Sequence, residues 1–156
     1  MYNDPVGEIL ESFDTISLDG MDSVKLMTRI DTKYVTTAEK LEDILNECRM
    51  GYTVLETGGE RIHGYDSTYY DTGSMEMYRR HHDGRLARYK IRTRTYLDSG
   101  QSFLEIKKKD NHSRSIKKRI SIDALDSWEN SGVNQAFISN HSPYGISEIS
   151  PALRTS

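Results

Sequence analysis

Alternation of charged and apolar positions is the clearest pattern in the chain, and it is strongest in residues 87–97, ARYKIRTRTYL. Successive side chains of a strand point to opposite faces, so this stretch predicts a strand with one cationic face. Residues 101–110 and 115–122 repeat the pattern. Their reverse faces carry Leu and Ile, which are expected to be buried. The cationic positions of the three strands are Arg88, Lys90, Arg92, Arg94, Lys107, Lys109, Lys117 and Arg119.

Turn residues separate these strands. DSG at 98–100 and NHSR at 111–114 predict hairpin turns, so the three strands should be antiparallel neighbours. A tyrosine-rich strand is predicted before them at residues 62–72, and a short strand at 52–56. Residues 26–37, LMTRIDTKYVTT, predict a further strand with charged residues on one face: Arg29, Asp31 and Lys33.

Apolar positions three or four residues apart predict helices over residues 5–13 and 37–49. Thr36 and Glu39 have the spacing of a capping box at the start of the second helix. We expect its apolar stripe, which includes Leu41 and Ile44, to pack on the apolar face of the sheet. The order of elements predicts an α+β fold with an antiparallel sheet. Residues 123–156 form a loosely patterned helical or irregular tail, and the length predicts one domain over residues 1–156.

Charge is distributed unevenly. The chain has a formal net charge of −3, but residues 79–119 contain fourteen Lys or Arg against four Asp or Glu, so this segment carries +10 and the rest −13. Such asymmetry favours a focused positive site. The single cysteine, Cys48, excludes an internal disulfide and indicates a reducing compartment. We find no signal peptide and no apolar run long enough to span a membrane, so we expect a cytoplasmic protein.

A charged strand face is commonly a solvated outer face, but several in succession suggest a binding site. The sheet could be flat, with water on its charged face, or a closed barrel with charged residues inside. Inward-pointing cations repel one another unless something compensates. Asp31 and Glu105 compensate in part, and a polyphosphate chain would compensate better. Arg grips phosphate oxygens bidentately and Lys supplies a point charge, which is what phosphoryl transfer mainly requires. The sequence has no Gly-rich P-loop and no nucleophile elbow.

Five motifs in order, RIDTKY, YDSTYYDT, YKIRTRTY, FLEIKKK and SIKKRI, resemble the VTC domain, the polyphosphate polymerase domain of the vacuolar transporter chaperone family. That family belongs to the triphosphate tunnel metalloenzymes. The resemblance implies a tunnel-shaped antiparallel β-barrel with basic residues lining the interior and helices packed outside. It also implies an ATP:polyphosphate phosphotransferase, which transfers the terminal phosphoryl group of ATP to a growing polyphosphate chain with the help of a divalent metal, Mn or Mg.

The resemblance assigns roles by position. Catalytic roles fall to Lys33, Arg92, Arg94, Lys107 and Lys117. It gives substrate binding to Arg29 and Arg119, and the alternation of charge adds Arg88, Lys90 and Lys109 to the substrate-binding residues. The family's metal-binding glutamate is expected beyond residue 156, and Glu105 is the candidate within the chain. We therefore expect the chain to represent the N-terminal half to two-thirds of a tunnel domain, with open sheet edges that a homo-oligomer could pair.

Two other functions remain open at this point: a tunnel-type triphosphatase that hydrolyses tripolyphosphate or a nucleoside triphosphate, and a non-catalytic polyphosphate-binding module. Tunnel triphosphatases begin with Glu-x-Glu-x-Lys, whereas the corresponding stretch ending at Lys33 has a single acid, which favours a polymerase-like site. Nucleic acid is not an expected partner, because the most basic strand has only Tyr96 in line with its cations.

Overall fold

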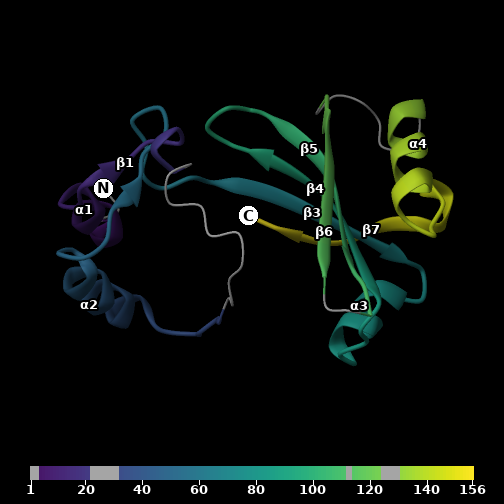
Figure 1. Cartoon of the computed structure of the whole chain (residues 1–156), viewed down its shortest axis with the longest axis horizontal. Helices are drawn as coiled ribbons and strands as arrows, with labels where there is room; N and C mark the ends of the chain where they lie inside the picture. Colours follow the sequence, from purple (N-terminus) through teal and green to yellow (C-terminus); the bar gives the residue numbers. More distant parts are fainter. Residues whose placement is uncertain (1–3, 22–31, 112–113, 124–130) are drawn as a thin grey trace. The chain divides into compact units, whose positions relative to one another are not determined.

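The computed structural model describes residues 4–21, 32–111, 114–123 and 131–156, and these form two compact units (Figure 1). The units are Met1–Ile62 and His63–Ser156. In the first, α1 (Pro5–Glu11) begins at Asp4, whose carboxylate accepts a hydrogen bond from the Gly7 amide at 3.1 Å. A two-residue parallel ladder joins β1 (Thr15–Ile16) to β2 (Val54–Leu55).

Helix α2 (Ala38–Cys48) confirms the predicted second helix but differs in its cap. Thr37, rather than Thr36, caps it by accepting from the Lys40 amide at 3.3 Å. The helix contacts α1 within the first unit, and Leu41 and Ile44 remain 36% and 42% exposed. The described contact of α2 lies within the first unit, and the packing of its stripe on the sheet stays a prediction. Within the second unit, the apolar face of the sheet is covered by another helix, described below.

The strand predicted at residues 26–37 is not confirmed. Its first part, including Arg29 and Asp31, lies outside the described residues. The described remainder, residues 32–37, is irregular and exposed. No strand in the described part of the chain pairs with it, and an extended segment without a ladder partner is not held as a strand.

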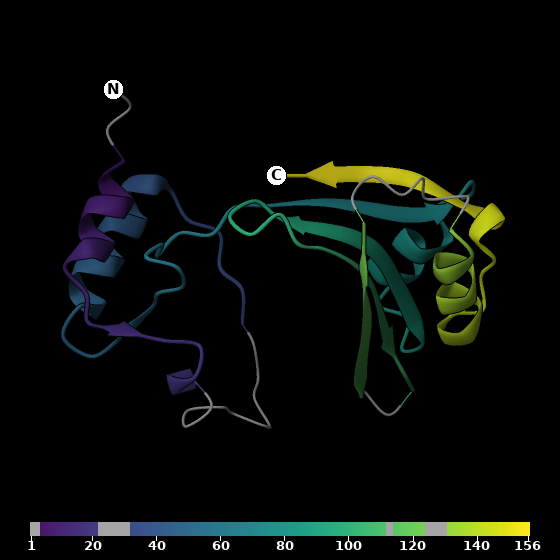
Figure 2. The ribbon, with the colours of Figure 1, turned by 90° about the horizontal axis from the view of Figure 1, so that it is seen from above.

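Five antiparallel strands make up the sheet of the second unit, in the order β6-β5-β4-β3-β7. Figures 1 and 2 show that this sheet twists strongly from β7 to β6. At the predicted turn between β4 and β5, Gly100 has φ +67°, a conformation that a residue without Cβ adopts readily. The strands are β3 (Tyr65–Thr72), β4 (Arg88–Tyr96), β5 (Ser102–Lys109), β6 (Ser115–Ile122) and β7 (Ile149–Thr155).

The apolar face of this sheet forms the core with α4 (Gly132–His141), which lies against the sheet in Figure 1. Ile91 and Leu104 of the sheet and Ile138 of the helix are fully buried. Helix α3 (Glu76–His82) adds Met77 to the same cluster. Burial of this face is what the alternating pattern predicts for the reverse side of a charged strand.

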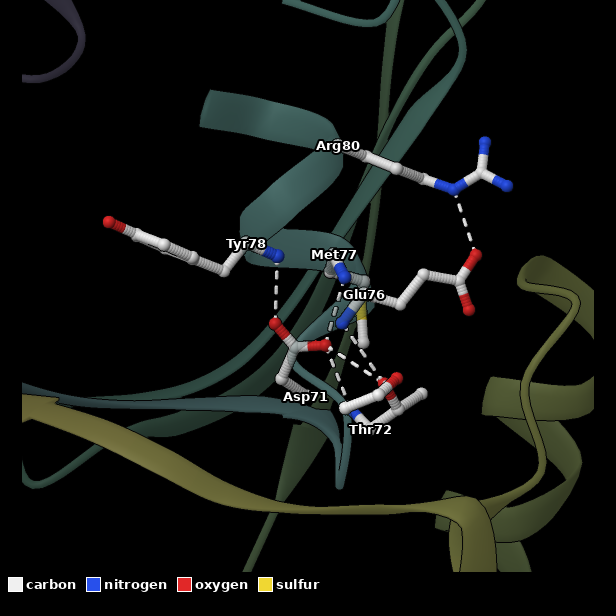
Figure 3. A network of polar contacts seen from close by, with 7 residues as sticks. Asp71, Thr72, Glu76, Met77, Tyr78 and Arg80 are labelled. Carbon is white, nitrogen blue, oxygen red and sulfur yellow. Dashed lines mark hydrogen bonds and ion pairs between the residues drawn. The ribbon is translucent and has the colours of Figure 1, made fainter. Parts of the chain in front are cut away.

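Asp71, at the end of β3, holds the start of α3 (Figure 3). The helix begins after Met75, which has φ +58° and provides no side-chain cap. Asp71 supplies the cap instead: its carboxylate accepts from the amides of Met77 at 2.9 Å and Tyr78 at 2.8 Å. Thr72 adds its hydroxyl, which accepts from the Glu76 amide at 3.1 Å. The YDT motif therefore fixes a helix to the edge of the core.

The α+β fold with an antiparallel sheet is confirmed, whereas the tunnel is not. Among the described residues the sheet is open: β6 and β7 are its edges and do not pair with each other, so no closed barrel is present. Five strands are too few for the roughly eight-stranded barrel whose interior accommodates side chains. The tail predicted to be loosely patterned forms α4, a short 3₁₀ helix (Ile146–Glu148) and β7. Pairing with β3 orders β7, and this pairing spans some eighty residues, so local sequence does not signal it.

None of the helices in the described residues is long and apolar enough to span a membrane.

Candidate functional site

The register of the sheet brings eight of the predicted site residues to one face. Directly opposed residues of neighbouring antiparallel strands point the same way. Arg88 is opposite Lys109, Arg92 is opposite Glu105, and Lys107 is opposite both Lys90 and Lys117. We call this surface the basic face; its cations are Arg88, Lys90, Arg92, Arg94, Lys107, Lys109, Lys117 and Arg119.

Three lysines form a row across the basic face. Lys90 of β4, Lys107 of β5 and Lys117 of β6 are directly opposed in consecutive strands. Neighbouring strands are about 4.8 Å apart, so the row concentrates three like charges within a short distance. Like charges in opposed positions destabilise a sheet. In the lysine row (Lys90, Lys107, Lys117), Lys107 is opposite a lysine on either side, and an anion lying across the row would relieve this repulsion.

Glu105 lies in the middle of the basic face and is only 3% exposed. Its Oε2 accepts from the Arg92 Nε at 2.7 Å and lies 2.6 Å from the Arg92 Nη2. Its Oε1 forms an ion pair with the Lys117 ammonium from the other side. Burial raises the pKa of the Glu105 carboxyl, but the hydrogen bonds and charges of Lys117 and Arg92 outweigh it, so the pKa lies below its ordinary value.

Both central arginines are held by their Nε atoms. Arg92 donates its Nε hydrogen to Glu105, and Arg94 donates its own to the hydroxyl of the fully buried Ser67 at 3.1 Å. Arg92 also donates from Nη1 to the Tyr69 hydroxyl at 3.2 Å. A guanidinium has five N–H donors in one plane, so each arginine keeps terminal donors in a fixed orientation. Fixed terminal donors suit the oxygens of a phosphate group.

Aromatic rings support the cations of the basic face. The Arg94 guanidinium lies 3.8 Å from the centroid of Tyr65, and the Lys90 ammonium lies 4.4 Å from that of Tyr69. Arg119, although opposite Glu105 in register, stacks on Phe103 at 4.6 Å. Each contact is a cation–π interaction that holds a flexible cation above the sheet.

The sequence-based expectation of a face without interleaved aromatics is therefore wrong. It considered only residues in line on one strand, whereas the rings come from the neighbouring strands β3 and β5. Tyr69 has a polar part in the site as well. Burial raises the pKa of its phenol, but the hydrogen bond from Arg92 and the charges of Lys90 and Arg94 outweigh burial and hold the pKa below its ordinary value.

Arg88 belongs to the basic face and lies at the start of β4, where its Nη1 donates to the Arg85 carbonyl at 2.6 Å. The two remaining predicted cations are Lys33 and Arg29. Lys33 belongs to the first unit and lies in an exposed irregular segment. Arg29 lies outside the described residues. The structure thus gathers eight of the ten predicted cations on one surface.

A divalent metal does not fit the described carboxylates. No group of three or more His, Cys, Asp or Glu side chains in the described residues could hold a metal ion. Glu105, the candidate ligand, is already paired with Arg92 and Lys117. Asp71 is engaged with the start of α3. Glu105 is therefore a counter-ion in this arrangement.

Comparison with known proteins gives one result. The model of the VTC domain family matches residues 28–143, a segment that contains β3 to β6, α2 and α4. A search of curated protein sequences finds no match.

Proposed function

Because the chain belongs to the VTC domain family, which implies a polyphosphate-related function, we propose that it acts as a polyphosphate polymerase domain. It would transfer the terminal phosphoryl group of ATP to the end of a polyphosphate chain. The basic face would then form one wall of the tunnel that the family resemblance implies. The proposal places the protein in the cytoplasm, in keeping with its single cysteine, Cys48.

The lysine row is the observation that carries this proposal. Three opposed lysines lie beside two oriented arginines, Arg92 and Arg94, and Glu105 neutralises this group only in part. The cations repel one another without a ligand and are favourable around a chain of negative charges. A solvated outer face gives no reason to bury Glu105 and Ser67 as acceptors for arginine Nε atoms. An extended polyanion accounts for both features, because it can contact several positions of the face at once.

The reaction demands positioning and neutralisation of charge more than covalent chemistry. A terminal oxygen of the polyphosphate chain attacks the γ-phosphorus of ATP, the bond from that phosphorus to the β,γ-bridging oxygen breaks, and ADP leaves. In this proposal the terminal nitrogens of Arg92 and Arg94 and the ammonium groups of Lys107 and Lys117 contact the phosphoryl oxygens. Lys33 keeps the catalytic role that the family resemblance implies for it.

Substrate binding falls, in the same proposal, to the outer cations of the basic face and to Arg29. These are Arg88, Lys90, Lys109 and Arg119. The divalent ion, Mn or Mg, that the family resemblance implies would supply further neutralisation of the phosphates when bound.

The test is incubation of the chain with ATP and Mn or Mg, followed by a gel stained for polyphosphate and an assay for free phosphate. Long chains support the proposal. Free phosphate alone would identify a triphosphatase, and retention of labelled polyphosphate without any product would identify a binding module.

Adjacent residues of β6 provide a matched pair of variants. Lys117 lies on the basic face, whereas Lys118 is opposite Ile106 on the other face. Both substitutions to Ala remove one exposed lysine from the same strand, so they alter the total charge equally. Lys117→Ala should reduce product formation and Lys118→Ala should not. Equal reductions would point to general attraction by the basic segment and would contradict a site on this face.

A further inference from the structure

Glu105 is the one carboxylate in the middle of the basic face, and its position is unusual for a site that attracts anions. It is 3% exposed and belongs to β5, the strand between β4 and β6. It bonds a cation from each neighbour: Arg92 of β4 through Oε2 and Lys117 of β6 through Oε1. A carboxylate so placed weakens the positive field that would draw a polyanion. Its presence therefore calls for a role that outweighs this loss.

The geometry around Arg92 shows what Glu105 provides. Arg92 is clamped between two neighbours in register, Glu105 on β5 and Tyr69 on β3. Its Nε and Nη2 face the Glu105 carboxylate, and its Nη1 donates to the Tyr69 hydroxyl. These contacts fix the plane of the guanidinium and with it the directions of its remaining hydrogens. A donor oriented before the ligand arrives loses less conformational freedom on binding.

Arg94 offers a comparison within the same strand. Its Nε donates to Ser67, and its guanidinium stacks on Tyr65, so neither contact involves a charged partner. Arg119 stacks on Phe103. Arg92 is therefore the arginine of the basic face whose orientation depends on Glu105, and Lys117 is the lysine that depends on it.

We propose that Glu105 is the positioning residue of the basic face: it does not contact the anionic ligand but orients Arg92 and Lys117 for it. This inference rests on the proposed polyphosphate-related function. Direct contact with phosphate is excluded for an ionised carboxylate by like-charge repulsion. Glu105 contributes by holding its two cations at fixed positions in neighbouring strands, so that phosphate oxygens meet donors already in place.

A double-mutant cycle on tripolyphosphate binding tests this role. Affinity is measured by calorimetry for the unchanged chain, Arg92→Ala, Glu105→Gln and the double variant. Coulomb energies superpose, so the charge of Glu105 affects the ligand equally in both backgrounds and cancels from the cycle. The coupling energy that remains in the cycle therefore reports the change in the position of Arg92. Arg92→Ala should weaken binding roughly 10- to 100-fold in the unchanged chain, the range for a hydrogen bond to a charged group. In the Glu105→Gln background, Arg92→Ala should weaken binding by only about threefold or less.

Arg94→Ala serves as the control, because Ser67 and Tyr65 hold Arg94 without Glu105. Its effect should be the same in both backgrounds. Additive losses for Arg92 and Glu105 would overturn the inference while leaving the proposed function intact. Equal non-additivity for Arg94 would also overturn it, since it would indicate general distortion of the sheet. If the unchanged chain failed to bind tripolyphosphate, the proposed function would fall and this inference with it.

A second variant and a spectroscopic signature cover the case in which Glu105→Gln fails to fold. Glu105→Asp keeps the charge but shortens the side chain by one methylene, so it should remove the coupling to Arg92 with the field unchanged. The arginine Nε–H signals in NMR spectra of the folded variant provide the independent readout. The Arg92 signal should shift or be lost by exchange, and the Arg94 signal should stay. An unchanged Arg92 signal in a folded Glu105 variant would overturn the inference.

Discussion

Replacing Asp71 by Ala should destabilise the second unit more than its position at the end of a strand suggests. Asp71 is 5% exposed, and its carboxylate accepts from the amides of Thr72, Met77 and Tyr78 (Figure 3). Loss of a helix cap costs about 0.5–2 kcal/mol. The Met77 amide lies in a buried contact, and a buried donor without an acceptor costs about 1–3 kcal/mol more. In the variant the Tyr78 amide can donate to water instead, because Tyr78 is 59% exposed. We expect a total loss of about 2–4 kcal/mol in the free energy of unfolding.

Urea denaturation followed by circular dichroism measures this loss, and hydrogen exchange of the Met77 amide assigns it to the second unit. Asp71→Asn retains one acceptor oxygen and should lose about half as much. Glu76→Gln is the matched control on the same helix. Its ion pair with Arg80, at 2.8 Å, joins side chains that are 40% and 47% exposed, so its loss should cost no more than about 0.5 kcal/mol. If Asp71→Ala lowered the free energy of unfolding by as little as Glu76→Gln, the role of Asp71 as the helix cap would be refuted.

Three further predictions concern the basic face and use tripolyphosphate titration by calorimetry. Arg92→Ala should weaken binding by about 1.5–3 kcal/mol, and Arg92→Lys should recover part of this, because a point charge does not reproduce the planar donors. Arg79→Ala, on α3, should change the affinity for tripolyphosphate little. A loss of affinity as large as that for Arg92→Ala would reveal a diffuse basic surface. Tyr69→Phe should weaken binding by about 1 kcal/mol by freeing the Arg92 Nη1, whereas Tyr65→Phe keeps the ring under Arg94 and should bind normally. Lys107→Gln should weaken binding yet raise the free energy of unfolding by about 0.2–1 kcal/mol, because it removes a like-charge contact from the lysine row; a stability loss in urea would contradict that reasoning.

Local patterns were sufficient to predict the strands that carry the site. In β4, β5 and β6 the side-chain period of two is nearly unbroken, and DSG at 98–100 defines the first hairpin. Once two strands join through a tight turn, their register follows, and with it the face on which each cation lies. This is why alternation alone placed Lys107 and Lys117 on the same side as Arg92.

Elements that depend on distant partners could not be predicted in the same way. β7 is an edge strand with mostly exposed residues, ordered by its pairing with β3. α3 spans only seven residues, too few for a helical period to be distinct, and its start is determined by Asp71 in the preceding strand. The packing of α4 on the sheet likewise depends on which face is left uncovered, and this becomes known only when the sheet is assembled.

The site itself shows where a one-dimensional pattern ceases to inform. Alternation treats Arg92, Arg94 and Arg119 as equivalent cations of one face, but their partners differ in kind: a carboxylate, a hydroxyl with a ring, and a ring alone. Those partners come from neighbouring strands, and Lys117 reaches Glu105 diagonally although Arg119 is the residue directly opposite. A ring or a hydroxyl holds an arginine without reducing its charge, whereas a carboxylate both orients and neutralises it. Three arginines that look equivalent in the sequence therefore differ. The contribution of Arg92 to anion binding depends on Glu105, whereas the contributions of Arg94 and Arg119 do not.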